Sequence, residues 1–455
     1  MAKTFSMTPK NVAPVDTRFR KIKTMFPVPE SLELIKSLRR NEPVSMTGQP
    51  LVLWDHAQGA SVYDSWGNQW IDWSSGVLIA NAGHNHPKIN QAIIDQARHG
   101  LLTSYCFPNS PRAELAELLI EISPKELSKA FILTTGSETV ECALKLMRTH
   151  GLKKGGKKKI TIISFEKAFH GRTLGAQQLG GIPALKEWIV NLDPAIVQVP
   201  FPDGFRNTDT DFSAFEKALA EKGIEPSSVA GVILETYQGG TASFAPKAYI
   251  QDLRKWCDKH GALLTFDEVQ AAFGRCGKMF GFEHYETMPD LTCLGKGISS
   301  CLPISAVLGR EEVMDLYGPN EMTSTHTGNP ICSAAAIANI KAMIEEKIPE
   351  HAAEMGKILK GGLLGLKDKY SDNIGAVHGQ GLVMGVQTVK PGGIEPDGDL
   401  AWEIVNACVE KGLLLFSPVG FGGATVKINP PLVIEEAALR EGLAVLDEAI
   451  EECIG

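Results

Sequence analysis

Two short stretches of the sequence end in side chains that could act on one ligand. An apolar run, Ala262–Phe266, ends in Asp267, and a second run, Leu291–Leu294, is followed by Lys296 between two glycines. Strands of a parallel sheet are buried on both faces, and functional groups lie just past their carboxyl ends. An aspartate can pair with a protonated ring nitrogen, and a lysine can form an imine with an aldehyde. Pyridoxal 5′-phosphate (PLP) requires this pair of groups.

Each stretch also has a simpler interpretation. Asp267 and Glu268 after a strand could form a helix cap or a solvated turn, and Gly295–Gly297 could be a flexible exposed turn. Because neither stretch is informative alone, the interpretation as a PLP site depends on further segments.

The segment FILTTGSETVECALKLM (131–147) has the pattern of a strand, a tight turn and a helix. Its apolar residues recur at the spacing of one helical stripe, at Val140, Ala143, Leu144 and Met147. We expect Ser137 at the N-cap, with Gly136 before it to allow close approach of the backbone. Because the first amides of a helix and its dipole bind anions, this turn suits a phosphate; the alternative is an ordinary capped helix.

Three more segments carry groups suited to the same ligand. In ISFEKAFHGRT (163–173), Phe169 could stack on a planar ring and Arg172 could grip a carboxylate, or they could be a core and a surface residue. VILETYQGG (232–240) ends a buried strand in Glu235, which could also simply pair with a base. TSTHTGNP (323–330) is a hydroxyl-rich turn that could bind phosphate or cap a helix.

The bulk composition limits the class of protein. The 455 residues exceed one ordinary core, so we expect two domains, and 44% hydrophobic with 22% charged residues is typical of a soluble globular protein. A net charge of −8 argues against nucleic acid as a partner, and no apolar run approaches the roughly 18 residues of a membrane span. Nine scattered cysteines without metal-ligand spacing predict reduced thiols, a cytoplasmic location and no metal site.

Helices and short apolar strands alternate from about residue 93 to 308, which predicts an α/β fold with a mostly parallel sheet. We expect strands at 130–133, 160–164, 229–234, 263–266 and 291–294, an antiparallel meander over 52–73, and a closing helix over 435–451. The expected domains are an arm and part of a small domain (1–75), a large cofactor domain (76–330) and a C-terminal small domain (331–455).

Taken together, these segments resemble the class III, or ω-amino-acid, aminotransferases. The resemblance covers the chain from about Val52 onward and is carried in order by SGVLIANAGHNHP, TTGSETVE, AFHGRT, ETYQGG, DEVQAAFGRCG, LGKGI, THTGNP and INPPLVI. It implies the fold-type-I architecture, PLP as cofactor, and a homodimer (or a dimer of dimers) with shared active sites. The substrates it implies are an amine donor and a 2-oxo acid.

The resemblance also implies roles for single residues. Lys296 resembles the Schiff-base lysine and Asp267 the carboxylate that keeps the ring nitrogen protonated. Lys296 is expected to have a lowered pKa. The other implied cofactor residues are Gly136 and Ser137 at the phosphate, Phe169 and Val269 at the two ring faces, Gln270 at the 3′ oxygen, His170, Glu235, and Thr325 from the partner subunit. The implied substrate residues are Val77, Arg172 and Lys427.

Two departures from the family pattern concern the substrate. Members that use both ω-amino acids and 2-oxoglutarate often carry a glutamate where this chain has Gly240, and an arginine where it has Lys427. Lysine is a point charge and not a planar fork, so recognition of an α-carboxylate is weakened. The expected donor is an ω-amino acid or primary amine resembling 4-aminobutyrate, and the acceptor is pyruvate or 2-oxoglutarate.

Two other functions remain open from the sequence. The first is a different PLP reaction on the same scaffold, namely an amino-acid or lactam racemase or a decarboxylating transaminase, which the two departures motivate. The second is a cofactor-free binding protein that retains the fold, against which Lys296 and Asp267 argue.

Overall fold

The computed structural model describes residues 3–455, which form two compact units. One unit joins the N-terminal part of the chain, up to His86, to the C-terminal part, from His351 onward. The other unit is Pro87–Glu350. The expected domain boundaries followed residues 75 and 330, and this three-part division stays a prediction.

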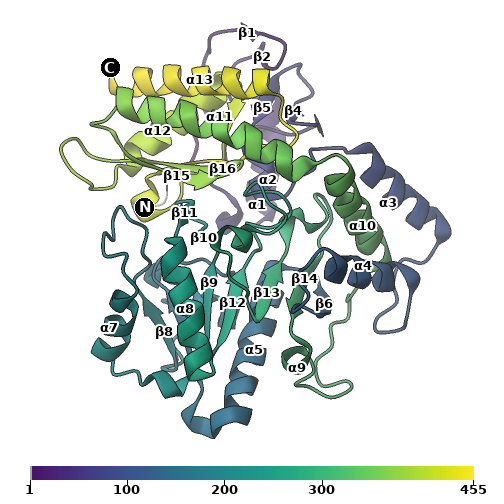
Figure 1. Ribbon diagram of the computed structural model, residues 1–455. Helices are drawn as coiled ribbons and strands as arrows, with labels where there is room; N and C mark the ends of the chain where they lie inside the picture. The colour runs from purple at the N-terminus through teal and green to yellow at the C-terminus, as the bar shows by residue number, and fades with distance from the viewer. Residues whose placement is uncertain (1–2) are drawn as a thin grey trace. The chain divides into compact units, whose positions relative to one another are not determined.

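The unit Pro87–Glu350 is built on a seven-stranded sheet with the strand order β6-β14-β13-β12-β9-β7-β8 (Figure 1). Its strands are β6 (Lys129–Leu133), β7 (Thr161–Phe165), β8 (Ile196–Val199), β9 (Val229–Glu235), β12 (Leu263–Asp267), β13 (Leu291–Leu294) and β14 (Ser305–Gly309). In this sheet β14 runs antiparallel to both of its neighbours, β6 and β13, and the pairs among β13, β12, β9, β7 and β8 are parallel. The five predicted strands are confirmed, and the mostly parallel α/β sheet is as expected; β8 and β14 were not predicted.

Helices α5 (Gly136–Gly155) and α8 (Lys247–His260) cover the sheet around β9 and β12. Thr265 of β12 contacts Met147 of α5, whereas its neighbour Phe266 stacks on Phe282 in a short 3-10 helix that packs against α8. Because successive side chains of a strand point to opposite faces, the two helices cover opposite faces of the sheet.

Shorter elements complete this unit. The helices α3 (Pro87–His99) and α4 (Ser110–Glu121) both pack on α10 (Pro330–Glu345). The remaining elements are α6 (Leu174–Leu179), α7 (Ser213–Glu221), α9 (Glu311–Met314), β10 (Tyr237–Gln238) and β11 (Ser243–Phe244).

The other unit contains two sheets. In the first, β1 (Val15–Asp16), β2 (Lys21–Ile22), β5 (Gln69–Asp72), β4 (Ser61–Tyr63) and β3 (His56–Gln58) lie in this order, with β17 (Leu413–Leu414) on β5. The second has the order β15 (Ile374–Gln380), β16 (Val383–Thr388), β18 (Thr425–Ile428). The predicted meander over 52–73 is confirmed as the antiparallel strands β3, β4 and β5.

The helices of this unit are α1 (Leu32–Asn41), α2 (Ser75–Leu78), α11 (Ile348–Lys369), α12 (Gly398–Glu410) and α13 (Glu436–Ile454). The predicted closing helix is α13, whereas α11 and α12 were not predicted. Across residues 3–455, every helix is too short or too polar to cross a membrane.

Candidate active site

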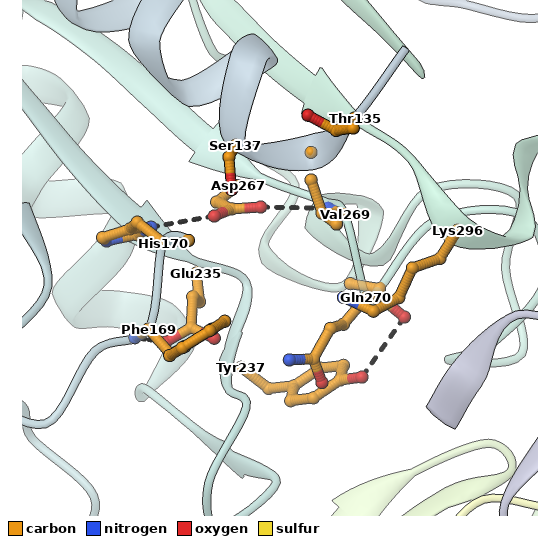
Figure 2. A pocket seen from close by; sticks show the side chains of 13 residues that line it. Thr135, Ser137, Phe169, His170, Glu235, Tyr237, Asp267, Val269, Gln270 and Lys296 are labelled. Atoms are coloured by element: carbon orange, nitrogen blue, oxygen red, sulfur yellow. Dashed lines mark hydrogen bonds and ion pairs between the residues drawn. The ribbon is translucent and has the colours of Figure 1, made fainter. Parts of the chain in front are cut away.

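A cavity lies where β9, β12 and β13 end and α5 begins (Figure 2). Its volume is about 170 Å³, and since a cavity of roughly 150 Å³ holds benzene, it has room for one aromatic ring. It is lined by Thr135, Gly136, Ser137, Phe169, His170, Gly171, Glu235, Tyr237, Asp267, Val269, Gln270, Ala271 and Lys296. Nine of the ten cofactor residues expected from the sequence therefore come together, and Thr325 is the exception.

The start of α5 differs by two residues from the expectation. Thr135, and not Ser137, is the N-cap: its hydroxyl accepts a hydrogen bond from Glu138 N at 3.3 Å, and Thr135 N donates to Glu138 Oε2 at 2.9 Å. This reciprocal pair is a capping box, which the spacing of Thr135 and Glu138 could have revealed. Gly136 and Ser137 are thus the first two helical residues, whose amides have no intrahelical acceptor and can face an anion.

The helix start packs closely against its neighbours. A Cβ on Gly136 would lie 2.7 Å from Val269 Cγ1, so only glycine allows Val269 this approach. Gly171 has a φ of +130°, and a Cβ there would collide with the Ser137 hydroxyl. The Ser137 hydroxyl also accepts a hydrogen bond from Arg172 N at 3.3 Å. These contacts fix the loop after β7 against the anion-binding turn.

Asp267 is held by two partners at the end of β12. Its Oδ1 accepts a hydrogen bond from Val269 N at 3.0 Å, and its Oδ2 lies 2.8 Å from His170 Nδ1 (Figure 2). The His170 side chain is buried. Burial lowers the pKa of His170, but the hydrogen bond to Asp267 and the charges of Asp267 and Glu235 outweigh it, so the net pKa is raised. A raised pKa favours the protonated imidazolium of His170, which can pair with the Asp267 carboxylate at this distance.

Glu235 brings a second carboxylate into the cavity from the end of β9. Its Oε2 accepts from Phe169 N and its Oε1 from Gly239 N, both at 2.9 Å. Burial raises the pKa of Glu235 to about 7; the charge of His170 opposes this rise and that of Asp267 adds to it. The two hydrogen bonds of the Glu235 carboxyl fix the backbone at Gly239 and at Phe169, whose ring lines the cavity.

Lys296 follows β13 and has a φ of +42°, a left-handed conformation that is uncommon outside glycine. Its side chain enters the cavity from a different strand than Asp267 (Figure 2). Loss of solvation lowers the pKa of Lys296, while Asp267 and Glu235 act to raise it. The direction agrees with the expectation, although the cause here is burial and not a neighbouring positive charge.

Four of the expected site residues, namely Arg172, Thr325, Lys427 and Val77, do not line the cavity. Arg172 is exposed and its guanidinium lies 5.5 Å from the centroid of Phe169, a cavity residue. Thr325 is exposed and does not line the cavity formed by its own chain. Lys427 is buried in β18, in the unit that the cavity residues do not belong to.

Val77 belongs to the same unit as Lys427 and lies in α2, which is a single left-handed turn. The φ angles of Ser75, Gly76, Val77 and Leu78 are 51°, 57°, 64° and 63°. L-residues rarely adopt this conformation in succession. The substrate roles of Val77, Arg172 and Lys427 stay predictions.

Four residues of the cavity were not predicted: Thr135, Gly171, Tyr237 and Ala271. Tyr237 is buried, and its hydroxyl donates to Gln270 O at 3.2 Å. Its position two residues after Glu235, on the same face of an extended segment, was a usable signal. No group of three metal-ligating side chains occurs in residues 3–455.

The side chains of the cavity fit PLP in three respects. The amides at the start of α5 suit a phosphate, the aromatic face of Phe169 and the apolar Val269 suit the two faces of a ring, and Asp267 suits a ring nitrogen. The buried His170 Nε2 has no hydrogen-bond partner among residues 3–455, so a polar group of a ligand or a water could satisfy it. The fold and the cavity together define an α/β enzyme with an amine and two acids at an anion-binding helix start.

Comparisons with known proteins specify this class. Residues 44–450 match the model of the aminotransferase class-III family. The chain is 36% identical to acetylornithine aminotransferase of Methanopyrus kandleri (86% of this chain, 92% of the relative). It is 33% identical to 4-aminobutyrate aminotransferase of Escherichia coli (88% and 93%), and 31% identical to alanine/serine racemase of Pyrococcus horikoshii (99% and 96%).

A solved structure gives the same result for the fold. A transaminase from the marine bacterium Virgibacillus superposes with a TM-score of 0.84 at 27% identity, covering 92% of this chain and 99% of that chain. The chain belongs to the class III aminotransferase family, whose members depend on PLP, and the predicted fold-type-I architecture is confirmed.

Proposed function

We propose that this transaminase binds PLP and transfers an amino group from an ω-amino acid or primary amine, such as a 4-aminobutyrate-like donor, to pyruvate or 2-oxoglutarate. The observation that carries the proposal is that Lys296 and Asp267, from neighbouring strands, line one cavity with the start of α5. The names of similar proteins, acetylornithine and 4-aminobutyrate aminotransferase, support a donor with a terminal amine. The transfer would take place in two half-reactions, so the amino group would stay on the enzyme after the donor has left and before the acceptor binds.

Each cofactor residue has a distinct task in this proposal. Gly136 and Ser137 would bind the phosphate through their amides, and Lys296 would hold the cofactor covalently by its amine. Phe169 and Val269 would pack on the two ring faces, Gln270 would bond the 3′ oxygen, and Asp267 would pair with the ring nitrogen. When bound, PLP withdraws electrons from the substrate carbon whose C–H bond is broken.

The residues around Lys296 suit it to move a proton. Loss of solvation lowers the pKa of its amine, so a larger fraction is the free base near neutral pH. In the proposed reaction Lys296 Nζ would carry a proton between the substrate carbon that bears the amine and C4′ of the cofactor. Asp267, held in place by His170 and Val269 N, would pair with the ring nitrogen of the cofactor.

Arg172 is proposed to bind a carboxylate of the substrate. Its guanidinium lies over the ring of Phe169, which places a cation at the rim of the cavity. The retained Arg172 would accept the far carboxylate of 4-aminobutyrate or 2-oxoglutarate in bidentate fashion. Lys427 and Val77 are proposed as further substrate contacts.

The assembly is proposed to be a homodimer, or a dimer of dimers, with shared sites. Thr325 is exposed in its own chain and lies outside that chain's cavity, so a role at the phosphate requires a second copy. A cytoplasmic location stays a prediction from the cysteine pattern.

A racemase reaction on the same scaffold is the second candidate. The alanine/serine racemase of Pyrococcus horikoshii aligns over 99% of this chain, and Gly240 and Lys427 stand where many aminotransferases carry the paired glutamate and arginine. Both reactions begin with removal of a proton from the carbon that bears the amine, so Lys296 would serve either.

One experiment separates the two candidates. The purified holoenzyme is incubated with a single amine or one amino-acid enantiomer and no oxo acid. An aminotransferase consumes about one equivalent of donor per site and stops, whereas a racemase turns over repeatedly and yields the other enantiomer. A panel of amine donors against pyruvate and 2-oxoglutarate then identifies the substrates, and no turnover with any pair would refute the proposal.

A further inference from the structure

Glu268 follows Asp267, the last residue of β12, but does not share its surroundings. Its side chain binds Phe282 N, and Phe282 packs on Phe266, so Glu268 lies on the face of the sheet that Phe266 occupies. The side chain of Glu268 is completely buried and does not line the cavity. Burial raises the pKa of the Glu268 carboxyl to about 7. Because a buried carboxylate is costly unless hydrogen bonds replace its hydration, its partners define its role.

Three donors from two other segments bind this carboxylate. The Thr236 hydroxyl donates to Glu268 Oε1, and Phe282 N donates to the same oxygen at 2.9 Å. Gly281 N donates to Oε2 at 2.6 Å. Both oxygens are therefore in use, and they connect the end of β12 to the end of β9 and to the 3-10 helix Gly281–Tyr285.

These two segments adjoin residues of the cavity. Thr236 stands between Glu235 and Tyr237, and both of these line the cavity. The loop from Val269 to Phe280 leads from Glu268 to its two amide donors, and its first three residues also line the cavity. The Glu268 carboxylate, which precedes this loop, therefore hydrogen-bonds to the two residues that follow it and holds the two ends of the loop together.

Packing around the three hydrogen bonds leaves little room for adjustment. A Cβ on Gly281 would lie 2.9 Å from Thr236 Cγ2, 2.9 Å from Ala271 Cβ and 3.1 Å from Glu268 Oε1. In addition, Tyr285 donates its hydroxyl to Thr236 O at 2.5 Å. A shift of the 3-10 helix would therefore move the loop and the end of β9 together.

We propose that Glu268 is a positioning residue for the cofactor: its carboxylate holds the ends of β9 and β12 and the loop 269–280 so that Asp267 and Gln270 face one ligand. The inference rests on the proposed function, since PLP is that ligand. Functional side chains need supporting groups that lock their geometry, and Glu268 supplies this support from the far face of the sheet.

Replacement by glutamine tests the carboxylate with almost no change in volume. An amide has one acceptor oxygen, whereas the backbone amides of Gly281 and Phe282 donate to different oxygens of Glu268. In Glu268→Gln one of these two N–H groups must face the amide nitrogen and lose its acceptor. Glu283 offers a matched control, because its carboxylate accepts from Phe280 N at 2.7 Å within the same short helix.

The experiment measures the dissociation constant of PLP by equilibrium titration of the apoprotein, together with the midpoint of its thermal unfolding. We expect Glu268→Gln to raise the PLP dissociation constant about tenfold or more, and Glu283→Gln to leave it within about twofold of wild type. With saturating PLP, Glu268→Gln should lower kcat and leave KM for the amine donor near wild type, because the donor itself does not touch Glu268.

A purely structural role gives a different result, namely a lower unfolding midpoint with a PLP dissociation constant within about twofold of wild type, and this would overturn the proposal. If Glu268→Gln does not fold, Thr236→Val decides: loss of the hydroxyl should weaken PLP binding about threefold or more, and Thr236→Ser should restore it. An unchanged PLP dissociation constant for Thr236→Val would refute the positioning role of Glu268 and would leave the proposed function intact. Wild-type protein that binds no PLP would refute the proposed function as well.

Discussion

Asp267 and Glu235 occupy the same register position at the ends of the neighbouring parallel strands β12 and β9. Both side chains consequently lie on one face of the sheet, where two negative charges repel each other. His170, 2.8 Å from Asp267, supplies the compensating positive charge. Because the pKa of Glu235 is raised to about 7, part of this acid keeps its proton near neutral pH, which reduces the repulsion. Asp267 pairs with His170, whereas Glu235 binds the backbone at Phe169 and Gly239, so the two acids have different tasks.

The raised pKa of Glu235 predicts a pH dependence of stability. A carboxyl whose pKa is higher in the folded than in the unfolded state binds more protons when folded, so the free energy of unfolding falls as the pH rises between the two values. For Glu235 this window runs from the ordinary value of 4.5 to about 7. The contribution is complete below the window and is lost above it.

Glu235→Gln removes this titration. We expect the apoprotein variant to lose less stability than wild type between pH 5 and pH 7.5, by about 1–3 kcal/mol since one pKa unit corresponds to about 1.4 kcal/mol. Urea denaturation at the two pH values measures the difference. The variant also loses a hydrogen bond to Phe169 N or Gly239 N, which should lower its free energy of unfolding equally at both pH values. The prediction is contradicted only if the free energy of unfolding changes with pH as much in the variant as in wild type.

Lys296→Ala should abolish turnover, because no other amine lines the cavity among the described residues. PLP should then be removed by dialysis, whereas the wild-type protein should retain it. Visible absorbance after dialysis and mass spectrometry after borohydride reduction measure this. The exposed Lys145 provides a control, since Lys145→Ala should keep both cofactor and activity. Retained turnover in Lys296→Ala would reject its assigned role.

Asp267→Asn should lower kcat/KM by about 10²- to 10³-fold, the range for loss of one preorganised electrostatic group. The variant keeps the size of the side chain and an oxygen to accept the hydrogen bond from Val269 N. We therefore expect circular dichroism and the unfolding midpoint to stay near those of wild type. A comparable loss of activity and of folded protein would instead indicate a structural role.

The main sheet and the centre of the site were predictable from the sequence because local patterns encode them. The strands that end in Glu235, Asp267 and the turn before Lys296 are continuous apolar runs, and their shared edge follows from parallel topology. Long-range structure was less accessible. Strand β14 runs antiparallel within this sheet, and nothing in Ser305–Gly309 itself specifies that direction.

Other differences have local causes. Helix α11 contains Gly356, Gly361, Gly362 and Gly365, which weaken a helical pattern, yet Gly356 and Gly362 pack too closely on other atoms for a larger residue. Serine favours N-caps, which predicts the cap at Ser137, whereas the capping box selects Thr135. The partners of Glu268 lie 32, 13 and 14 residues away in sequence, so only the folded chain reveals them.

Arg172→Ala should weaken the binding of substrates that carry a distal carboxylate more than the binding of simple amines. Loss of a charge-assisted hydrogen bond corresponds to roughly a 10- to 100-fold increase in KM for 4-aminobutyrate or 2-oxoglutarate. Arg172→Lys keeps the charge without the planar fork, so we expect an intermediate value. A primary amine that lacks a carboxylate serves as the control substrate, and equal losses for both donors would remove the proposed role.

The contact between Gly136 and Val269 allows a test by compensation. A Cβ on Gly136 would lie 2.7 Å from Val269 Cγ1, so Gly136→Ala should displace the start of α5 or the Val269 side chain. Overpacking of this kind costs about 1–3 kcal/mol, which corresponds to a PLP dissociation constant raised about 5- to 150-fold. Val269→Ala alone removes methyl groups next to the proposed ring and should weaken binding less. The double variant makes room for the new methyl group, so it should bind PLP more tightly than Gly136→Ala does. Additive losses in the double variant would show that the two residues act on the cofactor independently.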